Sequence, residues 1–357
     1  MTANKKDVTT FTKDILRWFD RHGRHDLPWQ KNTTPYRVWV SEIMLQQTQV
    51  STVTPYYQRF MKSFPSVKAL ALAKQDDVLA HWSGLGYYAR ARNLHRASQI
   101  IHQKHHGRFP NTVDALIELP GIGRSTAGAI LSLAMEIPAT ILDGNVKRVL
   151  ARYHAIEGWP GKTDVLKKLW EVAEQYTPLK RCNDYTQAMM DLGAIICTRT
   201  QPKCLLCPLV KCCKAHAMSC EEDFPGKKPK SDYPTKATRF ILLLDSANQL
   251  LLEKRPPVGI WGGLWSFPEC PVDTPLEKWC DQYIQCEILR QENLPILYHK
   301  FSHFQLKIQP ILLNIQPKAH LVMESNERVW YHKNDSLPGG IAAPVSKLLS
   351  HFKFLSE

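Results

Sequence analysis

The chain of 357 residues is long enough for two domains of ordinary size, and its 44% hydrophobic and 22% charged residues are typical of a globular protein. Its formal net charge is +13, and the whole excess lies in residues 1–236, because residues 237–357 carry 12 basic and 12 acidic side chains. No run approaches the ~18 apolar residues of a membrane-spanning helix, and residues 1–12 lack an apolar signal core, so we expect a cytosolic protein rather than a membrane protein. The clustered positive charge favours a polyanion as partner, although a basic surface kept for solubility would give the same count.

Residues 13–218 are predicted to be mostly helical. Apolar side chains recur at helical spacing, as at Leu94, Ala97 and Ile101, and short breaks rich in Pro and Gly separate the periodic stretches.

The periodic stretch Pro35–Met61 contains a glutamate, Glu42, among hydrophobic neighbours. Such surroundings should desolvate the carboxyl group and raise its pKa, which would make Glu42 a proton donor at neutral pH. A core glutamate in an ion pair with an arginine is the structural alternative. The polar run Gln46–Gln49 that follows is either a solvated face or a set of amides directed at nucleic-acid bases.

Leu119-Pro120-Gly121-Ile122-Gly123 lies between two predicted helices, 113–118 and 124–134. Gly121 and Gly123 would let the backbone approach a ligand closely, and the free N–H groups of the following helix would suit a phosphate. The pattern is that of a helix-hairpin-helix, which binds a DNA backbone without reading its sequence, although an ordinary turn fits two glycines equally well.

Asp143 follows the hairpin by twenty residues, where an apolar run ends and a helix is predicted to begin. Its structural interpretation is a helix N-cap. Its functional interpretation is a carboxylate that faces bound DNA and stabilises a cationic sugar.

Four cysteines crowd into a short stretch with the spacing C-x6-C-x2-C-x5-C: Cys197, Cys204, Cys207 and Cys213. In a reducing compartment such a group indicates metal ligation rather than disulfides. The spacing alone leaves zinc and an iron–sulfur cluster open, and Cys212 competes with Cys213 as the fourth ligand.

The pattern changes near residue 220. Residues 219–236 are polar, charged and rich in Pro, as expected of a linker. Short apolar runs at 240–244, 250–253, 265–267 and 308–315 then predict strands, and 345–354 predicts a final helix. We therefore expect a helical domain over 1–218, a linker over 219–236 and an α+β domain over 237–357.

Taken together, the hairpin, the following aspartate, the helical glutamate and the cysteine cluster resemble the helix-hairpin-helix DNA glycosylase superfamily. Within it, the chain resembles the MutY-type adenine DNA glycosylases from about residue 10 to its C-terminus. Further matching segments include Leu27-Pro28-Trp29, Ser41–Val50, Gly84–Arg90, Gln187–Gly193 and Phe301-Ser302-His303.

The resemblance implies removal of adenine mispaired with 8-oxoguanine or, less readily, with guanine in double-stranded DNA, after extrusion of the adenine from the stack. Glu42 would protonate adenine N7, and Asp143 would stabilise the oxocarbenium-like sugar. Ser125 stands where strand-cutting relatives carry a lysine that forms a Schiff base, so a monofunctional enzyme is implied.

The family match also implies site residues beyond the two acids. Trp29 and Gln187 would line the adenine pocket, and Gln47, Leu85 and Tyr87 would fill the gap near 8-oxoguanine. The four cysteines, with Cys213 as the last, would hold a structural [4Fe–4S] cluster. Without the match, each of these residues would be read as an ordinary core or surface residue.

Residues 237–357 resemble a Nudix-like domain that opens with Trp261–Pro268. Residues 269–291 lack the Arg-Glu and Glu-Glu array of the metal-binding Nudix signature, so pyrophosphate hydrolysis is expected to be lost. The family uses Phe301, Ser302 and His303 to inspect 8-oxoguanine.

Three alternatives remain at this stage. They are a related glycosylase for oxidised pyrimidines, a non-enzymatic iron–sulfur DNA sensor and a Nudix hydrolase with a DNA-binding extension. We expect a monomer that associates with the bacterial nucleoid and has no membrane partner.

Overall fold

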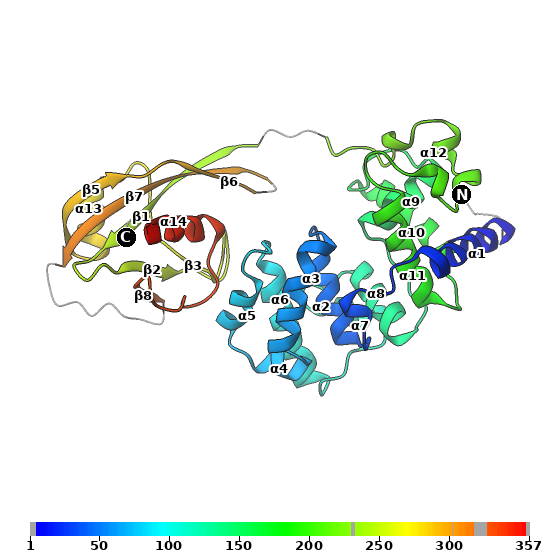
Figure 1. Cartoon of the computed structure of the whole chain (residues 1–357), viewed down its shortest axis with the longest axis horizontal. Coiled ribbons are helices and arrows are strands. Elements are labelled where there is room, and N and C mark those ends of the chain that lie inside the picture. The colour runs from blue at the N-terminus through cyan, green and yellow to red at the C-terminus, as the bar shows by residue number, and fades with distance from the viewer. Residues whose placement is uncertain (1–4, 230–232, 302, 318–326, 355–357) are drawn as a thin grey trace. The chain divides into compact units, whose positions relative to one another are not determined.

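The computed structural model describes residues 5–229, 233–301, 303–317 and 327–354, and it divides into two compact units (Figure 1). The first unit comprises Met1–Leu72 and Asn93–Lys230, and the second comprises Ala73–Arg92 and Ser231–Glu357. Within the described residues, no helix has both the length and the apolar composition needed to span a bilayer.

The first unit is all-helical, as expected. Its α-helices and their bounds are α1 (Lys5–His22), α2 (Pro35–Leu45), α3 (Val50–Ser63), α4 (Val67–Leu72), α6 (Ala89–Lys104, which begins in the second unit), α7 (Val113–Ile117), α8 (Arg124–Met135), α9 (Gly144–His154), α10 (Thr163–Tyr176), α11 (Cys182–Asp191) and α12 (Lys214–Ala217). Short turns of other helical types are η1 (Pro28–Gln30), the π-helical η2 (Leu192–Ile196), η3 (Cys204–Leu206), η4 (Val210–Cys212) and η5 (Glu221–Asp223).

Side-chain caps fix where several of these helices begin. The backbone N–H of Arg37 donates to Thr34 Oγ1 at the start of α2, and that of Ala115 donates to Thr112 Oγ1 at the start of α7. Each bond satisfies one of the N–H groups that a helix start leaves without a partner.

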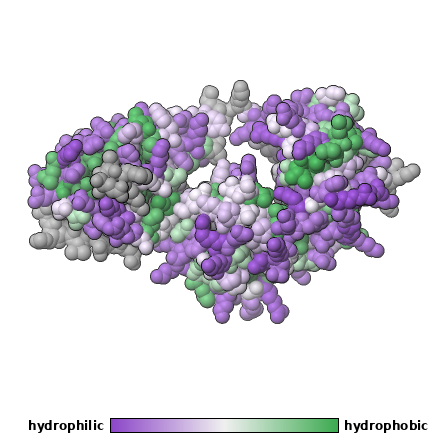
Figure 2. Space-filling view, viewed as in Figure 1, coloured by the Kyte–Doolittle hydropathy of each residue, from purple (hydrophilic) through white to green (hydrophobic). Residues whose placement is uncertain are grey.

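One hydrophobic core joins α1 to α8, α9, α10 and α11. Its fully buried members include Ile15, Leu150, Leu169, Ala188 and Leu192. Surface residues on the face shown in Figure 2 are mainly hydrophilic over this unit. The amphipathic periodicity read from the sequence therefore corresponds to burial on one side of each helix.

The predicted helical stretch Pro35–Met61 is two helices rather than one. Helix α2 ends at Leu45, and α3 begins at Val50. The polar run Gln46–Gln49 forms their connection, in which Gln47 has a φ of 58°. A left-handed residue cannot continue a helix, so the run interrupts the pattern and does not form a solvated helical face.

The second unit is built on a mixed sheet. Its strands are β1 (Thr235–Leu244), β2 (Leu250–Lys254), β3 (Trp265–Ser266), β4 (Glu269–Cys270), β5 (Cys286–Asn293), β6 (Leu297–Lys300), β7 (Gln305–Pro317) and β8 (Arg328–Tyr331), and its helices are α5 (Gln75–Trp82), α13 (Leu276–Tyr283) and α14 (Ala343–Phe354). The strand order is β3-β2-β1-β7-β5, while β4 pairs with β1, β6 with β7 and β8 with β2. Strands β1 and β7 pair in parallel, with Thr235 opposite Gln305, and the other pairs are antiparallel.

The core of this unit lies between the sheet and α13. Ile241, Leu243 and Leu313 from the central strands and Cys280 of α13 are fully buried there, and Trp279 of α13 is 7% exposed. The apolar runs predicted from the sequence supply this core, and the arrangement confirms the expected combination of strands and helices.

Residues 73–92 belong structurally to the second unit, although they lie within the helical part of the sequence. Lys254 Nζ lies 2.7 Å from an Asp76 carboxylate oxygen. Arg92 donates to the carbonyl oxygen of Gly262 over 2.6 Å, and the Tyr88 hydroxyl donates to that of Ile341 over 3.1 Å. This long-range packing has no signature in local sequence.

The predicted linker is shorter than expected at both ends. Phe224 is buried, and the N–H of Gly226 donates to the carbonyl oxygen of Gly158, so the first part of 219–236 packs onto the helical unit. At the other end, β1 begins at Thr235 because its first residues already pair with β7.

Candidate active site and metal centre

The first unit contains an open cavity of about 1060 Å³ that brings together six of the residues selected from the sequence. They are Trp29, Glu42, Gln47, Ser125, Asp143 and Gln187. Helix α2 supplies Glu42, the N-termini of α8 and α9 supply Ser125 and Asp143, and α11 supplies Gln187. The volume is sufficient for a flat heteroaromatic ligand with part of its sugar.

Glu42 projects from α2 toward this cavity. Ser41, Ile43 and Met44 on either side of it are buried, and Glu42 keeps only partial exposure because it lines the cavity. Burial, and secondly the negative charge of Asp143, raise the pKa of Glu42 to about 8. The expected upward shift is confirmed, and no arginine neutralises this carboxyl group among the described residues.

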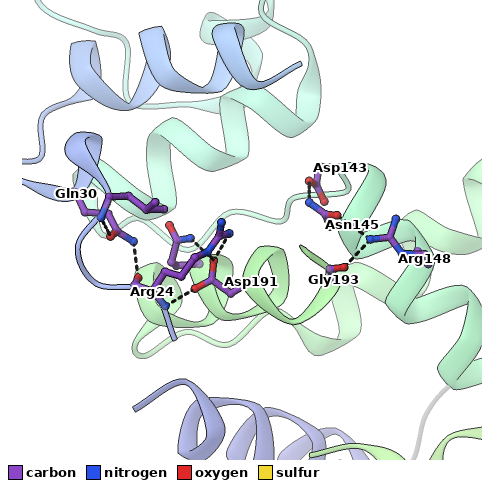
Figure 3. A network of polar contacts seen from close by, with 9 residues as sticks. Arg24, Gln30, Asp143, Asn145, Arg148, Asp191 and Gly193 are labelled. Atoms are coloured by element: carbon purple, nitrogen blue, oxygen red, sulfur yellow. Dashed lines mark hydrogen bonds and ion pairs between the residues drawn. The ribbon is translucent and has the colours of Figure 1, made fainter. Parts of the chain in front are cut away.

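Asp143 is the N-cap of α9 and also lines the cavity. Its Oδ1 accepts a hydrogen bond from the Val146 N–H over 2.8 Å, and its Oδ2 accepts one from Asn145 Nδ2 over 3.1 Å (Figure 3). Burial raises the pKa of Asp143, while these hydrogen bonds oppose the rise. The structural and functional interpretations of Asp143 are therefore compatible, because a capped side chain still faces the cavity.

A polar network connects Asp143 to the cysteine loop. Figure 3 shows Asn145 between Asp143 and Arg148. Arg148 donates to Asn145 Oδ1 over 2.8 Å, to the Gly193 carbonyl oxygen over 2.6 Å and to the Cys197 carbonyl oxygen over 2.7 Å. The placement of Asp143 thus depends on the backbone that carries the first cysteine.

The hairpin forms as predicted between α7 and α8. Gly121 has a φ of 80°, and a Cβ there would lie 2.8 Å from Asn93 Cβ, so only glycine fits. Gly123 is the N-cap residue of α8 and is exposed with Gly121. The N–H of Leu142 donates to Ser125 Oγ over 3.0 Å, which ties the hairpin helix to the residue that precedes Asp143.

The four selected cysteines lie in one partly buried loop after α11. Burial raises the pKa of Cys204 to about 11 and that of Cys207 to about 12, and for Cys204 the hydrogen bond to Glu221 and the charge of Glu221 add to the rise. Cys197 and Cys213 contribute to both shifts, whereas Cys212 is exposed and hydrogen-bonds with Tyr153. This arrangement groups Cys213, and not Cys212, with the other three.

The loop supplies the donor atoms that a metal centre needs, because all four cysteines are free thiols. In the described part of the chain, the only group of three donor atoms within 4.8 Å of one another is that of Cys204, His216 and Glu221. Thiolate sulfur suits both zinc and an iron–sulfur cluster, so the donor set is compatible with either.

Arg152 braces the cysteine loop from within, although it is only 2% exposed. It donates to the carbonyl oxygens of Glu221 and Thr198 over 2.8 and 2.6 Å, and Nη1 lies 3.3 Å from Cys197 Sγ. Arg152 also donates hydrogen bonds to the carbonyl oxygens of Phe224 and Arg199. Because its buried guanidinium donates to several carbonyl groups of the loop, Arg152 stabilises the loop fold and leaves all four cysteines available as ligands.

The remaining selected residues lie in the second unit. Leu85 is buried and Tyr87 is 53% exposed, in the loop before α6. Phe301 is half-buried and stacks on Phe304 at 4.5 Å, and His303 is exposed. Ser302 lies outside the described residues.

The sequence interpretation missed the polar residues that support the cavity. Arg24, Asn145, Arg148, Arg152 and Asp191 received no functional role from the sequence. Asn145 and Arg148 carried a usable signal, because they follow Asp143 in the first turns of its helix. The partners of Arg24 and Arg152 are remote in sequence, so no local signal could have found them.

Comparison with known proteins defines the class first. Residues 40–175 match the HhH-GPD superfamily of base excision DNA repair proteins, and residues 239–351 match the NUDIX domain. A solved structure of a thermostable thymine-DNA glycosylase is 29% identical and covers 60% of this chain and 98% of its own, with a TM-score of 0.54. The chain is thus a helix-hairpin-helix DNA repair protein followed by a Nudix-like domain.

Closer relatives narrow the class. The adenine DNA glycosylase of Buchnera aphidicola from Acyrthosiphon pisum is 43% identical over 96% of this chain and 97% of its own length. The human adenine DNA glycosylase is 33% identical over 96% of this chain and 74% of its own length. The chain belongs to the adenine DNA glycosylase family, and it is a hydrolase of the N-glycosidic bond in base excision repair.

Proposed function

We propose that this protein removes adenine mispaired with 8-oxoguanine, or less readily with guanine, from double-stranded DNA without cutting the strand. The observation that supports it most directly is that Glu42 and Asp143 line one cavity but have different surroundings, which affect their pKa values differently. With a pKa of about 8, Glu42 is largely protonated at neutral pH and can act as an acid. Burial raises the pKa of Asp143 as well, but Asp143 accepts two hydrogen bonds that oppose the rise and favour its carboxylate form.

The chemistry requires both groups. Adenine is a poor leaving group until N7 accepts a proton, and Glu42 supplies that proton after the nucleotide has been extruded into the cavity. Cleavage of the C1′–N9 bond leaves positive charge on the sugar, which the Asp143 carboxylate stabilises until water adds at C1′. The added water loses a proton, which returns the Glu42 carboxylate to its acid form, and the strand stays intact with an abasic site.

The hairpin and the cysteine loop would hold the DNA. Gly121 and Gly123 expose backbone beside the N-terminus of α8, which suits a phosphate. Arg199, Lys203, Lys211 and Lys214 are exposed on the cysteine loop. Cys197, Cys204, Cys207 and Cys213 would hold a [4Fe–4S] cluster, which would cross-link this loop and take no part in base removal.

The direct test is single-turnover adenine release from duplexes that carry adenine opposite 8-oxoguanine, guanine or thymine. We expect the rate to fall in that order, with release opposite thymine slowest by far. Release of an oxidised pyrimidine in preference to adenine would overturn the proposal.

Ser125 stands at the hairpin position where strand-cutting relatives carry a lysine, so we expect little covalent trapping of the product. Borohydride reduces a Schiff base between an amine and the opened sugar, and Ser125 offers only a hydroxyl group, which already accepts the Leu142 N–H. We expect trapped complex far below the yield of endonuclease III measured in parallel on its own substrate, and an increase in the Ser125→Lys variant. A wild-type yield equal to that of endonuclease III would contradict monofunctional chemistry.

The second unit would inspect the base opposite adenine. Phe301 sits in an aromatic cluster with Trp261 and His299, at ring distances of 5.3 and 4.6 Å, and these contacts hold its ring in place. Helix α13 carries Glu277 as its only glutamate, and no group of three acidic, histidine or cysteine ligands forms in the described part of this unit. These features support base recognition in place of pyrophosphate hydrolysis.

Changing His303 should therefore affect discrimination more than catalysis. We expect His303→Ala to reduce the ratio of adenine release opposite 8-oxoguanine to that opposite guanine by about five- to tenfold, the value of one polar contact. His351→Ala, an exposed histidine on α14, is the matched control and should leave the ratio unchanged. Equal losses on both duplexes would argue against a role in recognition.

A further inference from the structure

Asp191, the last residue of α11, is fully buried at 0% exposure, and no step of the proposed reaction uses it. Its Oδ2 accepts the backbone N–H of Arg24 over 2.7 Å. Its Oδ1 accepts hydrogen bonds from Nε and Nη2 of Arg24 over 2.9 and 2.6 Å (Figure 3). The same oxygen accepts one from Nε2 of Gln187 over 2.8 Å. Both carboxylate oxygens are therefore occupied by donors.

This arrangement fixes which end of the Gln187 amide faces the cavity. A carboxylate in an ion pair with a guanidinium only accepts hydrogen bonds, so the amide must present its NH2 group to Asp191. The carbonyl oxygen of Gln187 is then the polar atom left for a ligand. No described residue donates to that oxygen, and Gln187, only 8% exposed, lines the same cavity as Glu42.

We propose that Asp191 is a positioning residue that sets the polarity of the adenine pocket by locking the Gln187 carbonyl oxygen toward it. An inward carbonyl accepts a hydrogen bond from an exocyclic amino group such as that of adenine. It repels a carbonyl oxygen at the same position, as in hypoxanthine. The inference rests on the proposed function and specifies how the same cavity selects its base.

Asp191 also fixes a second segment that lines the pocket. It holds Arg24 through both backbone and side chain, while Gln30 Nε2 donates to the Arg24 carbonyl oxygen over 2.9 Å and Gln30 Oε1 accepts the Leu27 N–H over 3.0 Å. Trp29 lies in this anchored segment. If Asp191 only stabilised the structure, replacing it would loosen the segments that carry Gln187 and Trp29 and would slow the release of every base alike. If Asp191 sets the orientation of the Gln187 amide, replacing it changes the preference between bases.

The Asp191→Asn variant separates these two roles. An asparagine at this position has one oxygen and no charge for the four donors that the Asp191 carboxylate accepts, so it holds the Gln187 amide less firmly. The amide can then turn and present its NH2 group to the cavity. That group would oppose the amino group of adenine and favour the carbonyl oxygen of hypoxanthine, because a site built to accept a hydrogen bond loses its selectivity when its polarity reverses.

The experiment measures single-turnover release of adenine and of hypoxanthine from duplexes that differ only in that base. We expect the adenine-to-hypoxanthine rate ratio to fall at least fivefold in Asp191→Asn. In the double variant Gln187→Met/Asp191→Asn the ratio should equal that of Gln187→Met alone, because Asp191 acts through Gln187. Asp184→Asn is the matched control, because it removes an ion-paired carboxylate from the same helix, where Asp184 accepts from Arg181 at the surface. Its ratio should stay within twofold of the wild-type value.

Equal slowing of both bases in Asp191→Asn, with an unchanged ratio, would overturn the inference, as would a full additional effect in the Gln187→Met background. If Asp191→Asn does not fold, Gln187→Met alone decides, and an unchanged ratio in that variant overturns the inference. Failure of the wild-type protein to release adenine would instead refute the proposed function. The two outcomes are therefore distinguishable.

Discussion

Replacing Glu42 with glutamine is expected to reduce single-turnover adenine release by at least about a hundredfold, the range in which general acids contribute. Glutamine keeps the shape of the side chain but cannot give up a proton to adenine N7. Glu171→Gln, on the exposed side of α10 and outside the cavity, is the matched control and should retain the wild-type rate. A Glu42→Gln rate within tenfold of wild type would exclude Glu42 as the acid.

The pH dependence gives an independent signature of the same group. Because burial raises the pKa of Glu42 to about 8, the acid form persists through neutral pH, and the rate should decline as the pH rises through about 8. An unshifted glutamate would already lose this form near its ordinary pKa of ~4.3. The residual rate of Glu42→Gln should lack the decline near pH 8.

The Glu42→Gln substitution that lowers activity should leave the stability of the folded protein unchanged or raise it. A carboxyl group whose pKa is raised on folding favours the folded state at low pH, and this benefit is lost as the pH rises from about 4.5 toward 8. Glutamine needs no proton to occupy the site, so Glu42→Gln should unfold at the same or a higher temperature than wild type at pH 8. An inactive variant that is also less stable would point to misfolding instead of a lost acid.

The sequence predicts the parts of this site that depend on neighbouring residues and misses the parts that depend on contacts between residues far apart in the chain. The hairpin is local, because two glycines and the flanking periodicity fix it within a few residues. The position of Glu42 was likewise predictable, since its hydrophobic neighbours on α2 foretell desolvation. The cysteine spacing predicted a metal site but left zinc and an iron–sulfur cluster open, because thiolate ligands suit both.

The supporting groups act over long sequence separations and were not predictable. Asp191 contacts Arg24 across 167 residues, and Arg152 reaches carbonyls that follow it by up to 72 residues. In the second unit, strand β5 was missed because most of its side chains are exposed, which leaves no apolar run to detect. Residues 73–92 read as part of the helical domain, because helical periodicity does not reveal which unit a helix packs against.

Replacing Asp143 with asparagine is expected to lower single-turnover adenine release by about 10²–10³-fold, comparable with removal of one electrostatic stabiliser of a charged transition state. Asparagine is itself a good N-cap, so α9 should still begin at Gly144. What is lost is the negative charge beside the developing sugar cation. Asp164→Asn, in the first turn of α10 and outside the cavity, controls for a general change in helix charge.

Binding measurements locate the defect of Asp143→Asn in the chemical step. Removing a negative charge from a site that faces a polyanion should leave the affinity for the mispaired duplex unchanged or increase it, particularly at low salt. Slow release combined with undiminished binding is therefore the expected result. Binding that weakens in parallel with the rate would mean that Asp143 organises the DNA-binding surface, through Asn145 and Arg148, and does not stabilise the sugar.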